Sequence, residues 1–383
     1  MNNIPFAKPD LSRSDVGPLE EILEGGTLVH GKVTRQFEEE FAHRVGSEYA
    51  ISVSSCTAAL HLSLMAHDVG PGQSVLVPAM THVATAHAVE FCGAIPIFAD
   101  VDPATGNIDP LSIAQAIRPN TTAIIVVHYL GLPCDMDSIR SIAGSSNIKV
   151  IEDCALALGA TYKGRQVGTL GDAGCFSFYP TKHMTTIEGG MVTTNDTALA
   201  ERVRKQKAFG YDRSVEQRNL PGIYDVTMLG YNYRMNEVEA AIGLQQLKRL
   251  DNFQEARRRN WERLAAQLVG REDLVIFPRS LGSSDSSHFC LNVTFSEEAS
   301  IDRNTVLMRL KEAGVGCSVH YPVALPLSHY YRHRYGYRLG EFPTAEWIAA
   351  ETLSLPVGPH LVEGDIERIA QTLVDVLGAS RQR

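Results

Sequence analysis

Hydrophobic residues between positions 50 and 194 recur in short runs, several of which are separated by helix-length connections. The runs occupy residues 50–53, 74–77, 95–98, 123–127, 149–151, 175–178 and 191–194. Short apolar runs without polar alternation are typical of strands that are buried on both faces. This part of the chain is therefore predicted to form an α/β sheet with helices on both faces.

The segments outside this region have mostly helical patterns. Phe37, Phe41 and Val45 recur at a spacing of four and would share one face of a helix at 34–45. Further helices are predicted at 14–24, 236–268, 305–313, 346–353 and 362–377, and a half-buried strand at 289–295. Solvated positions are predicted for the loop at 202–224 and for the arginines at 257–259. We expect a large domain over residues 1–250 and a smaller α+β C-terminal domain over residues 251–383.

The composition limits the possible functions. The chain has 383 residues, 44% of them hydrophobic, and a net charge of −9, so it lacks the basic surface of a general nucleic-acid or anionic-membrane binder. It contains no apolar run of roughly 18 residues and no signal-peptide pattern, so a soluble, cytoplasmic protein is expected. The seven cysteines are scattered without a C-x-x-C pair, which indicates reduced thiols.

An acid and a lysine follow two of the predicted strands. Asp153 comes just after the run at 149–151, and Lys182 lies in a turn beyond the run at 175–178. Carboxyl ends of parallel strands form the ligand-binding edge of α/β proteins. A lysine can hold pyridoxal phosphate as a Schiff base, and an ionised acid can keep its pyridine nitrogen protonated. A turn cap explains Asp153 alone and a solvated side chain explains Lys182 alone, so the hypothesis depends on the pair.

A phosphate site is the next requirement. A predicted strand ends at Ser54 and Ser55, and a helix begins near Thr57. Backbone N–H groups at a helix N-terminus bind anions without a cationic side chain, and Ser177 could add a donor. An ordinary helix cap explains the first motif equally well, so the combination of motifs carries the argument.

Motifs along nearly the whole chain resemble one family, the DegT/DnrJ/EryC1/StrS family of pyridoxal-phosphate-dependent sugar aminotransferases. They are IPFAKPD, VSSCTAALHLSL, VPAMTHVATAHAVEFCGAIPIFADVD, IIVVHYLGLPCDMD, IEDCALALGATYKG, GCFSFYPTKHMTTIEGGMVTTND, LGYNYRMNEVEAAIGLQQL and VHYPVALPLSHYY. The resemblance implies a fold-type-I aminotransferase. Its large domain would contain a mixed, mostly parallel seven-stranded sheet, followed by a smaller α+β domain.

The resemblance also implies roles for single residues. Lys182 matches the lysine that forms the internal aldimine and Asp153 its pyridine-nitrogen partner, while His82 matches a ring over the cofactor and Asn232 a phosphate ligand from the neighbouring subunit of a homodimer. Residues expected to hold the cofactor are Lys182, Asp153, Cys56, Thr57, His82, Ser177 and Asn232. Residues expected to bind substrate are Glu188, His320, Tyr321, Arg234 and Arg213, with either arginine a candidate for the donor carboxylate.

Two positions depart from the family pattern. Leu156 stands where many members have Gln or His to bind the phenolic oxygen of the cofactor, and leucine cannot donate that hydrogen bond. Cys56 stands where glycine is frequent. A thiol at a helix start can have a lowered pKa, but a structural role is expected for this one.

The expected reaction moves an amino group from L-glutamate to a keto-sugar. The acceptor is expected to be nucleotide-linked, with the Glu of TTIEGG favouring amination at C4. An oxidised, 8-oxo 3-deoxy-octulosonate without a nucleotide is the alternative acceptor. A dehydratase or lyase is disfavoured because Lys182 is present, and a non-catalytic sensor stays open. The chain has no P-loop or dinucleotide-binding glycine motif, and a metal site at His329 and His333 lacks a third ligand, so no metal is expected.

Overall fold

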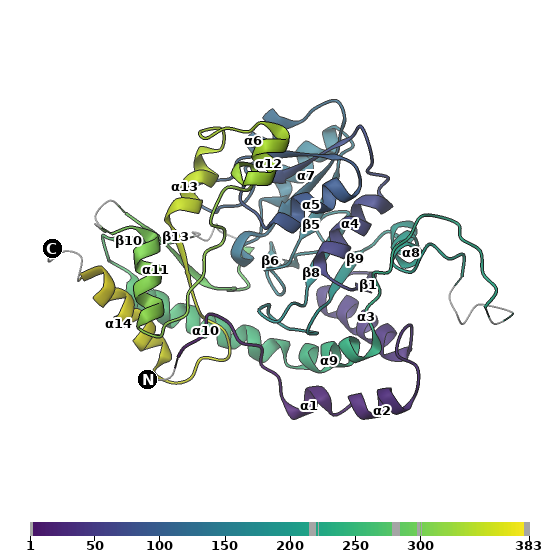
Figure 1. Ribbon diagram of the computed structural model, residues 1–383, viewed down its shortest axis with the longest axis horizontal. Coiled ribbons are helices and arrows are strands. Elements are labelled where there is room, and N and C mark those ends of the chain that lie inside the picture. The colour runs from purple at the N-terminus through teal and green to yellow at the C-terminus, as the bar shows by residue number, and fades with distance from the viewer. Residues whose placement is uncertain are drawn as a thin grey trace.

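The computed structural model describes residues 3–213, 220, 222–277, 284–296, 299 and 301–378. A seven-stranded sheet with the order β1-β9-β8-β5-β4-β2-β3 forms its centre (Figure 1). Strand β9 runs antiparallel to β1 and β8, and the other neighbours are parallel. The mixed, mostly parallel sheet is therefore confirmed, and every predicted run is a strand. The strands are β1 (Tyr49–Val53), β2 (Ser74–Pro78), β3 (Ile95–Ala99), β4 (Thr121–Val127), β5 (Lys149–Asp153), β8 (Ala173–Ser177) and β9 (Gly190–Thr194).

Two hydrophobic cores lie on the two faces of this sheet. Successive residues of a strand point to opposite faces, and accordingly Val75 and Val77 join one core while Leu76 joins the other. The first core contains α4 (Cys56–Ala66), α5 (Val83–Phe91) and α8 (Thr197–Gln206). The second contains α3 (Lys32–Val45), α6 (Pro110–Ala116), α7 (Met136–Ser145) and α9 (Glu237–Lys248). The prediction of helices on both faces is confirmed.

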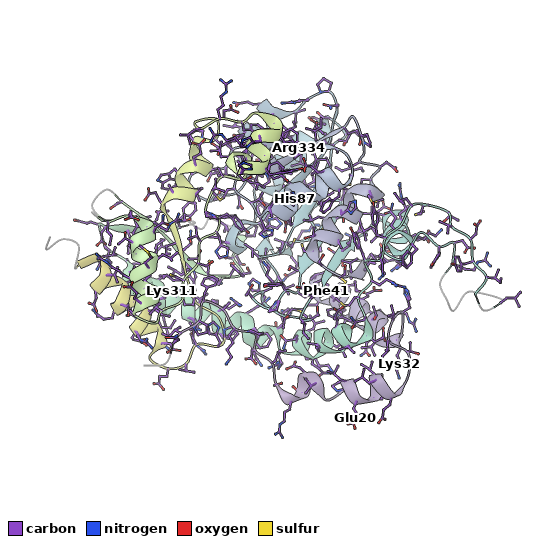
Figure 2. All side chains as sticks on the ribbon, viewed as in Figure 1. Glu20, Lys32, Phe41, His87, Lys311 and Arg334 are labelled. Atoms are coloured by element: carbon purple, nitrogen blue, oxygen red, sulfur yellow. The ribbon has the colours of Figure 1, made fainter. Side chains whose placement is uncertain are left out.

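The aromatic residues of α3 show how tightly a helix is held to the sheet. Phe41, labelled in Figure 2, packs with its ring centroid 5.1 Å from that of Phe176 and 5.4 Å from that of Phe178. Phe37 lies one turn earlier and also contacts Phe178. The spacing of four in the sequence thus produces the buried face that it predicts.

One edge of the sheet collects the segments with candidate chemistry. Strands β1, β5 and β8 run in the same direction, so their last residues Val53, Asp153 and Ser177 lie at one edge. Strand β9 runs the opposite way and begins at this edge, where Gly190 pairs with both Val53 and Ser177. The next residues after β1 and β8 therefore leave the sheet at the same place.

Two predicted helices are interrupted in the structure. The helix expected at 14–24 is α1 (Arg13–Val16) and α2 (Leu19–Glu24), because Pro18 has no N–H to continue the first helix. The helix expected at 236–268 is α9 followed by α10 (Leu250–Leu268), with Arg249 between them at φ −101° and ψ 0°. Both stretches are helical as predicted, but each is divided into two helices.

The expected solvated loop at 202–224 is wrong in part. Its first residues, 202–206, belong to α8, and the next residue, Lys207, is buried. The Lys207 amine pairs with Glu38 at 2.9 Å. Residues 214–219 and 221 of this segment lie outside the described residues.

A second, antiparallel sheet has the order β10-β12-β13 and consists of β10 (Leu274–Phe277), β12 (Leu291–Phe295) and β13 (Thr352–Leu355). Helices α10, α11 (Arg303–Glu312) and α14 (Asp365–Gly378) share its hydrophobic core. The sequence pattern predicts β12 but misses β10 and β13. Both missed strands are only four residues long, and β13 follows α13 (Pro343–Glu351) directly, so its apolar residues look like the end of that helix.

Shorter elements join the two parts. Helix α12 (His329–Tyr335) lies against α5: the Tyr331 hydroxyl lies 2.7 Å from His87 Nδ1, and Arg334 pairs with Glu90 at 2.8 Å, with His87 and Arg334 labelled in Figure 2. A small sheet has the order β11-β6-β7, and 3-10 turns cover Tyr129–Gly131 and Leu325–Leu327. The strands of the small sheet are β6 (Thr161–Tyr162), β7 (Arg165–Gln166) and β11 (Ser284–Asp285). Among the described residues, no helix is both long and apolar enough to cross a membrane.

Candidate functional site

Asp153 is held by hydrogen bonds at the end of β5. Its Oδ2 accepts a hydrogen bond from the Thr85 hydroxyl at 2.9 Å, and its Oδ1 accepts one from the backbone N–H of Ala155 at 3.1 Å. The Thr85 hydroxyl lies 2.8 Å from that of Thr81 and must accept from it, because its own proton points to the carboxylate. Two donors thus fix the orientation of a buried carboxylate.

Lys182 lies in the turn after β8. Its backbone N–H donates to the carbonyl of Tyr179 at 2.9 Å, and its Nζ lies 5.5 Å from the centre of the Phe289 ring. Burial lowers the pKa of the Lys182 amine, and the nearby Cys56 and Asp153 oppose this effect. A lowered pKa increases the fraction of neutral amine, which is the nucleophilic form. Lys182 and Asp153 are therefore brought into one electrostatic neighbourhood, as the sequence predicts.

Cys56 lies between the helix start and the acid. Its Sγ is 3.9 Å from Asp153 Oδ1 and 3.5 Å from the carbonyl oxygen of Cys175. Burial, and secondarily the charge of Asp153, raises the pKa of this thiol. The lowered pKa considered from its place at a helix start is therefore wrong, and the structural role fits the geometry.

The predicted anion site corresponds to the N-terminus of α4. Ser55 is the helix cap, and its side chain accepts a hydrogen bond from the N–H of Ala58 at 3.1 Å. Thr57 lies in the first turn, and Ser177 stands opposite Gly190 on the neighbouring strands. A Cβ atom on Gly190 would lie 2.6 Å from the nitrogen of Cys56. A glycine is required here for β9 to approach the helix terminus.

His82, His320 and Tyr321 meet on another side of the site. The His82 and Tyr321 rings lie 5.9 Å apart, and the His320 and Tyr321 rings 5.6 Å apart. His82 caps α5 by accepting the N–H of Ala84 at Nδ1, which places its proton on Nε2. Burial lowers the pKa of His320 to about 4 and raises that of Tyr321, with the charge of Asp153 a further cause for the tyrosine.

Four predicted site residues lie apart from this cluster within the described chain. Asn232 is exposed, and its Oδ1 accepts a hydrogen bond from Nε of Arg234 at 2.9 Å. Arg213 pairs with its neighbour Asp212 at 2.5 Å, and the Glu188 side chain is exposed. Within the described residues, no hydrogen bond or ion pair joins Lys182 or Asp153 to Asn232, Arg234, Arg213 or Glu188.

Three residues near the site, Glu152, His128 and Thr85, were not singled out from the sequence. The Glu152 carboxylate accepts backbone N–H groups of Gly168, Leu170 and Gly171 at 2.6 to 2.8 Å, and lies 2.9 Å from Nε2 of His128. The N–H of Cys134 donates to Nδ1 of the same ring, so His128 is neutral with its proton on Nε2. Thr85 was also missed, although its place in the THVAT motif, four residues after Thr81, is a helical spacing.

Metal binding has little support in the described residues. The one group of three ligand atoms within 4.8 Å of one another is formed by His128, Glu152 and Cys154. The ring and the carboxylate already use their atoms in the hydrogen bonds described above. His329 and His333 are exposed, as expected.

Leu156 is buried, and its backbone carbonyl accepts a hydrogen bond from the Ser287 hydroxyl at 2.8 Å. Its apolar side chain belongs to the core on the α4 and α5 side of the sheet. The position that often holds a hydrogen-bond donor in the family therefore serves packing in this chain.

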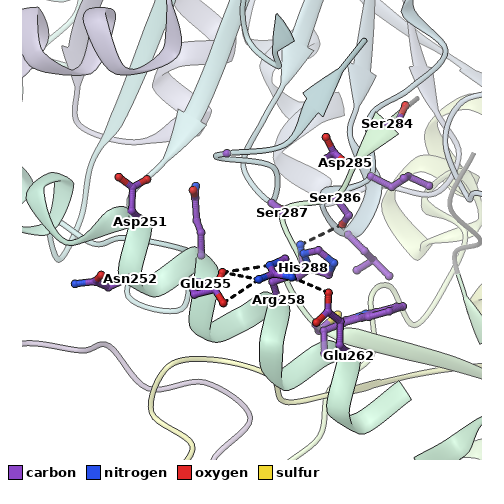
Figure 3. Close-up of a pocket in the computed structure, with 16 residues that line it drawn as sticks. Asp251, Asn252, Glu255, Arg258, Glu262, Ser284, Asp285, Ser286, Ser287 and His288 are labelled. Atoms are coloured by element: carbon purple, nitrogen blue, oxygen red, sulfur yellow. Dashed lines mark hydrogen bonds and ion pairs between the residues drawn. The ribbon is translucent and has the colours of Figure 1, made fainter. Parts of the chain in front are cut away.

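The cavity in Figure 3 is distinct from this cluster. It measures about 770 Å³, lies between α10 and residues 284–290, and is not lined by Lys182 or Asp153. Arg258 in its wall pairs with Glu255 at 2.8 Å and with Glu262 at 3.0 Å, so its charge is already offset by two carboxylates. The convergence of residues at the sheet edge is the better guide to the chemistry.

The residues at the sheet edge fit pyridoxal phosphate. A fixed, buried carboxylate suits the pyridine nitrogen, an amine with a lowered pKa suits the aldehyde, and the N-terminus of the eleven-residue helix α4 suits the phosphate. Gly190 keeps this helix terminus close to the strand ends.

Comparisons with known proteins agree with this reading. The model of the DegT/DnrJ/EryC1/StrS aminotransferase family matches residues 9–374. The spore coat polysaccharide biosynthesis protein SpsC of Bacillus subtilis is 36% identical over 98% of this chain and 97% of its own. The sugar aminotransferase CalS13 of Micromonospora echinospora is 29% identical, with a TM-score of 0.88 over 97% of this chain and 99% of its own. Spr1654 of Streptococcus pneumoniae in its PLP form is 27% identical, with a TM-score of 0.91 over 99% of both chains.

Proposed function

The chain belongs to the DegT/DnrJ/EryC1/StrS aminotransferase family, and we propose that it transfers an amino group from L-glutamate to a keto-sugar. Membership makes it a pyridoxal-phosphate-dependent aminotransferase with the fold-type-I architecture. The observation that supports the proposal best is the placement of Lys182, whose pKa is lowered by burial, near the fixed carboxylate of Asp153. When bound, the cofactor supplies an electron sink for proton removal from the donor.

Each residue of the cluster has a proposed task. Lys182 holds the cofactor and moves the proton at the α-carbon of the donor. Asp153, fixed by Thr85, would hold the pyridine nitrogen in its protonated form. The backbone at Cys56 and Thr57, with the hydroxyls of Thr57 and Ser177, binds the phosphate, and the ring of His82 covers the cofactor.

We also propose that the site is completed by a second copy of the chain. Asn232 would reach the phosphate of the partner's site, because its side chain is exposed on its own subunit. Large apolar side chains are exposed on the same stretch and near the sheet edge, as expected for a surface covered by a homodimer partner. They are Tyr179, Ile187, Phe209, Val226 and Leu229.

The residues proposed to bind the substrates come from both parts of the chain. His320 and Tyr321 approach the cofactor residues through the His82 ring and would contact the sugar. Glu188 would contact it from the turn before β9, and Arg234 or Arg213 would bind the donor carboxylate. Nucleotide phosphates would meet the basic cluster near Arg204, and amination at C4 of a nucleotide-linked sugar is the acceptor reaction that we favour.

The domain division near residue 250 is likewise a proposal. Helix α10 begins at Leu250 and shares a hydrophobic core with the second sheet. Residues 1–250 would form the cofactor-binding domain and residues 251–383 the smaller one. Ile4 also packs in the second core, so the N-terminal segment would tie the two domains together.

An alternative acceptor is an 8-oxo 3-deoxy-octulosonate, which carries an aldehyde and needs no nucleotide site. The polysaccharide function in the name of SpsC supports a glycan precursor in either case. A sugar dehydratase or lyase, or a sensor that binds the cofactor without turnover, is the alternative from another class. Lys182 disfavours the dehydratase, because transamination needs a lysine at this position.

The absorption spectrum of the purified protein tests the proposal. We expect a yellow band from the bound cofactor that bleaches when L-glutamate is added, followed by its return when the correct keto-sugar is supplied. Nucleotide-linked and nucleotide-free keto-sugars would be compared as acceptors. A yellow band that no amino donor bleaches would contradict the aminotransferase proposal and favour the sensor or lyase.

A further inference from the structure

Arg257 is buried although its sequence context, three consecutive arginines on a helix, predicts a solvated face. Only 5% of its surface is exposed, whereas Arg258 is exposed. Its Nη1 donates to the carbonyl oxygen of Phe289 at 2.9 Å, and its Nη2 donates to the carbonyl oxygen of Lys182 at 3.4 Å. The prediction of a solvated Arg257 is therefore wrong.

The buried guanidinium has an unusual set of partners. Among the described residues its hydrogen bonds go to these two carbonyl groups, no carboxylate pairs with it, and its Nε has no hydrogen-bond partner. Burial lowers the pKa of Arg257 to about 10. A buried charge without a counter-ion is costly, so an apolar residue at this position would be expected if packing were its only role.

The two carbonyl groups belong to residues that meet again at their side chains. The Lys182 Nζ lies 5.5 Å from the centre of the Phe289 ring. That ring also packs edge-on against His320 at 5.5 Å, and against His183 at 5.9 Å. Arg257 thus binds the backbone of the lysine and the backbone of the aromatic residue that covers its amine.

The contacts of Arg257 join the two parts of the chain. Arg257 lies on α10 and Phe289 precedes β12, both in the part built on the second sheet, whereas Lys182 follows β8 of the large sheet. The planar fork of arginine can bind two acceptors at once, which a lysine amine at the same position cannot do with the same geometry.

We propose that Arg257 is a positioning residue for Lys182, which fixes the lysine turn and the Phe289 ring relative to each other. The inference rests on the proposed function, in which Lys182 holds the cofactor. In this inference, one buried arginine links the second sheet to the reactive amine of Lys182.

The first test follows Lys182 without the cofactor. Acetylation of Lys182 in the apo-protein would be measured by mass spectrometry from pH 6 to 11, in wild type, Arg257→Met, Arg257→Lys and the neighbouring control Arg258→Met. The charged and titratable groups that lie near the amine are Cys56, Asp153, His82, His183 and His320. They are unchanged in every variant, so they serve as a common background.

In Arg257→Met we expect the midpoint of Lys182 reactivity to rise by about one pH unit, because water reaches the amine once its cover is released. Arg257→Lys should lie between this variant and wild type, and Arg258→Met should match wild type. If Arg257→Met denatures more easily but keeps the wild-type midpoint, Arg257 has only a structural role and the inference is wrong. If Arg257→Met does not fold, an unchanged midpoint in Arg257→Lys would overturn it in the same way.

The second test uses the loaded enzyme. We expect Arg257→Met to lower kcat by about ten to a hundredfold with a smaller change in KM, because misplacing a reactive group affects the chemical step. It should also shift the pH at which the cofactor band changes colour. Failure of the proposed function would appear in wild type, as the absence of a band that bleaches with glutamate. Failure of the present inference would appear as identical titrations of wild type and Arg257→Met.

Discussion

The residues proposed for the site are held in two different ways. Asp153, Cys56 and Ser177 stand at strand ends or at a helix start, and Lys182 lies in the turn after β8. Asp153 accepts a hydrogen bond from the Thr85 hydroxyl of α5. By contrast, Arg213, Asn232 and Arg234 belong to the stretch between α8 and α9. There Arg213 pairs with its own neighbour, and Asn232 bonds to Arg234 two residues away.

This difference indicates which part of the site one chain can supply. The strand-end group is positioned by the sheet and needs no further partner to adopt its geometry. In the second group, Arg213 and Asn232 have side-chain partners close in sequence, and Arg234 also lies 3.3 Å from Nε2 of His30. The proposed contribution of this group depends on a surface that a second chain would bring. Changes in the first group should therefore affect the chemical step, and changes in the second should depend on subunit composition.

The largest effect is expected for Lys182→Ala. We expect turnover to fall by about 10⁴-fold or more, because both the cofactor attachment and the proton carrier are lost. The free energy of unfolding should be unchanged or slightly higher, since the buried amine has a lowered pKa and is costly to bury. Steady-state rates and urea unfolding would measure both.

Lys163→Ala is the matched control for this change, because Lys163 is an exposed lysine that pairs with Asp137 on the surface. It should retain wild-type turnover. Measurable transamination by Lys182→Ala at more than about one hundredth of the wild-type rate would remove Lys182 from its proposed role.

The second effect is expected for Asp153→Asn, which preserves the shape of the side chain but removes its charge. We expect kcat to fall by about 10² to 10³-fold, since the fixed negative charge would no longer stabilise a protonated ring nitrogen. Thr85→Val keeps the charge and removes one hydrogen bond, so it should cost about tenfold or less. Equal losses in both variants would mean that orientation, not charge, is what Asp153 supplies.

Most residues of the strand-end group could be predicted from the sequence. Its members lie in or after short apolar runs, and the edge at which parallel strands end is a general consequence of the fold. Thr85 was missed because a threonine in the first turn of a helix is more often a surface or packing residue. Its role depends on the distance to Asp153, which is 68 positions away in the chain.

Other features could not be read from local patterns. Arg257 lies in a run of three arginines, and its burial is decided by the approach of Phe289 and Lys182 from distant segments. The break at Arg249 leaves the apolar periodicity of the two helices nearly continuous. Strand β13 was missed in the sequence pattern because it follows α13 without a turn residue.

A third prediction concerns His61, which connects the helix start at the strand-end group with the stretch that contains Asn232. His61 of α4 is buried, lies 3.3 Å from the Tyr233 hydroxyl through its Nδ1, and packs its ring 4.9 Å from that of Tyr231. Burial lowers the pKa of His61 from 6.5 to about 4. The unfolded chain therefore binds more protons than the folded one between these pH values, so stability present above pH 6.5 is lost as the pH falls toward 4.

The expected loss from this single group is about 3 kcal/mol at most. In His61→Leu the decrease in the free energy of unfolding between pH 7 and pH 4.5 should be smaller than in wild type, as measured by urea titration. His43→Leu changes an exposed histidine on α3 and should leave the pH dependence unchanged. A wild-type acid sensitivity in His61→Leu would show that His61 does not couple the stretch around Asn232 to α4.

The smallest effect, and the one that tests the comparison most directly, is expected for Asn232→Ala. Loss of one hydrogen bond to the phosphate should weaken cofactor binding by about tenfold, which is measured by titrating the apo-protein with pyridoxal phosphate.

If the asparagine acts across the dimer, mixing Asn232→Ala with the inactive Lys182→Ala creates mixed dimers with one intact site. Random mixing should then return about a quarter of the wild-type sites, assayed at a cofactor concentration that wild type binds and Asn232→Ala does not. Lys163→Ala is the control partner for Lys182→Ala, since Lys163 is an exposed residue outside the proposed site and this mixture should show only the sum of the separate activities. Activity that equals the sum of the separate proteins would place Asn232 in the site of its own chain, and the exposed stretch would then differ from the strand ends only in its burial.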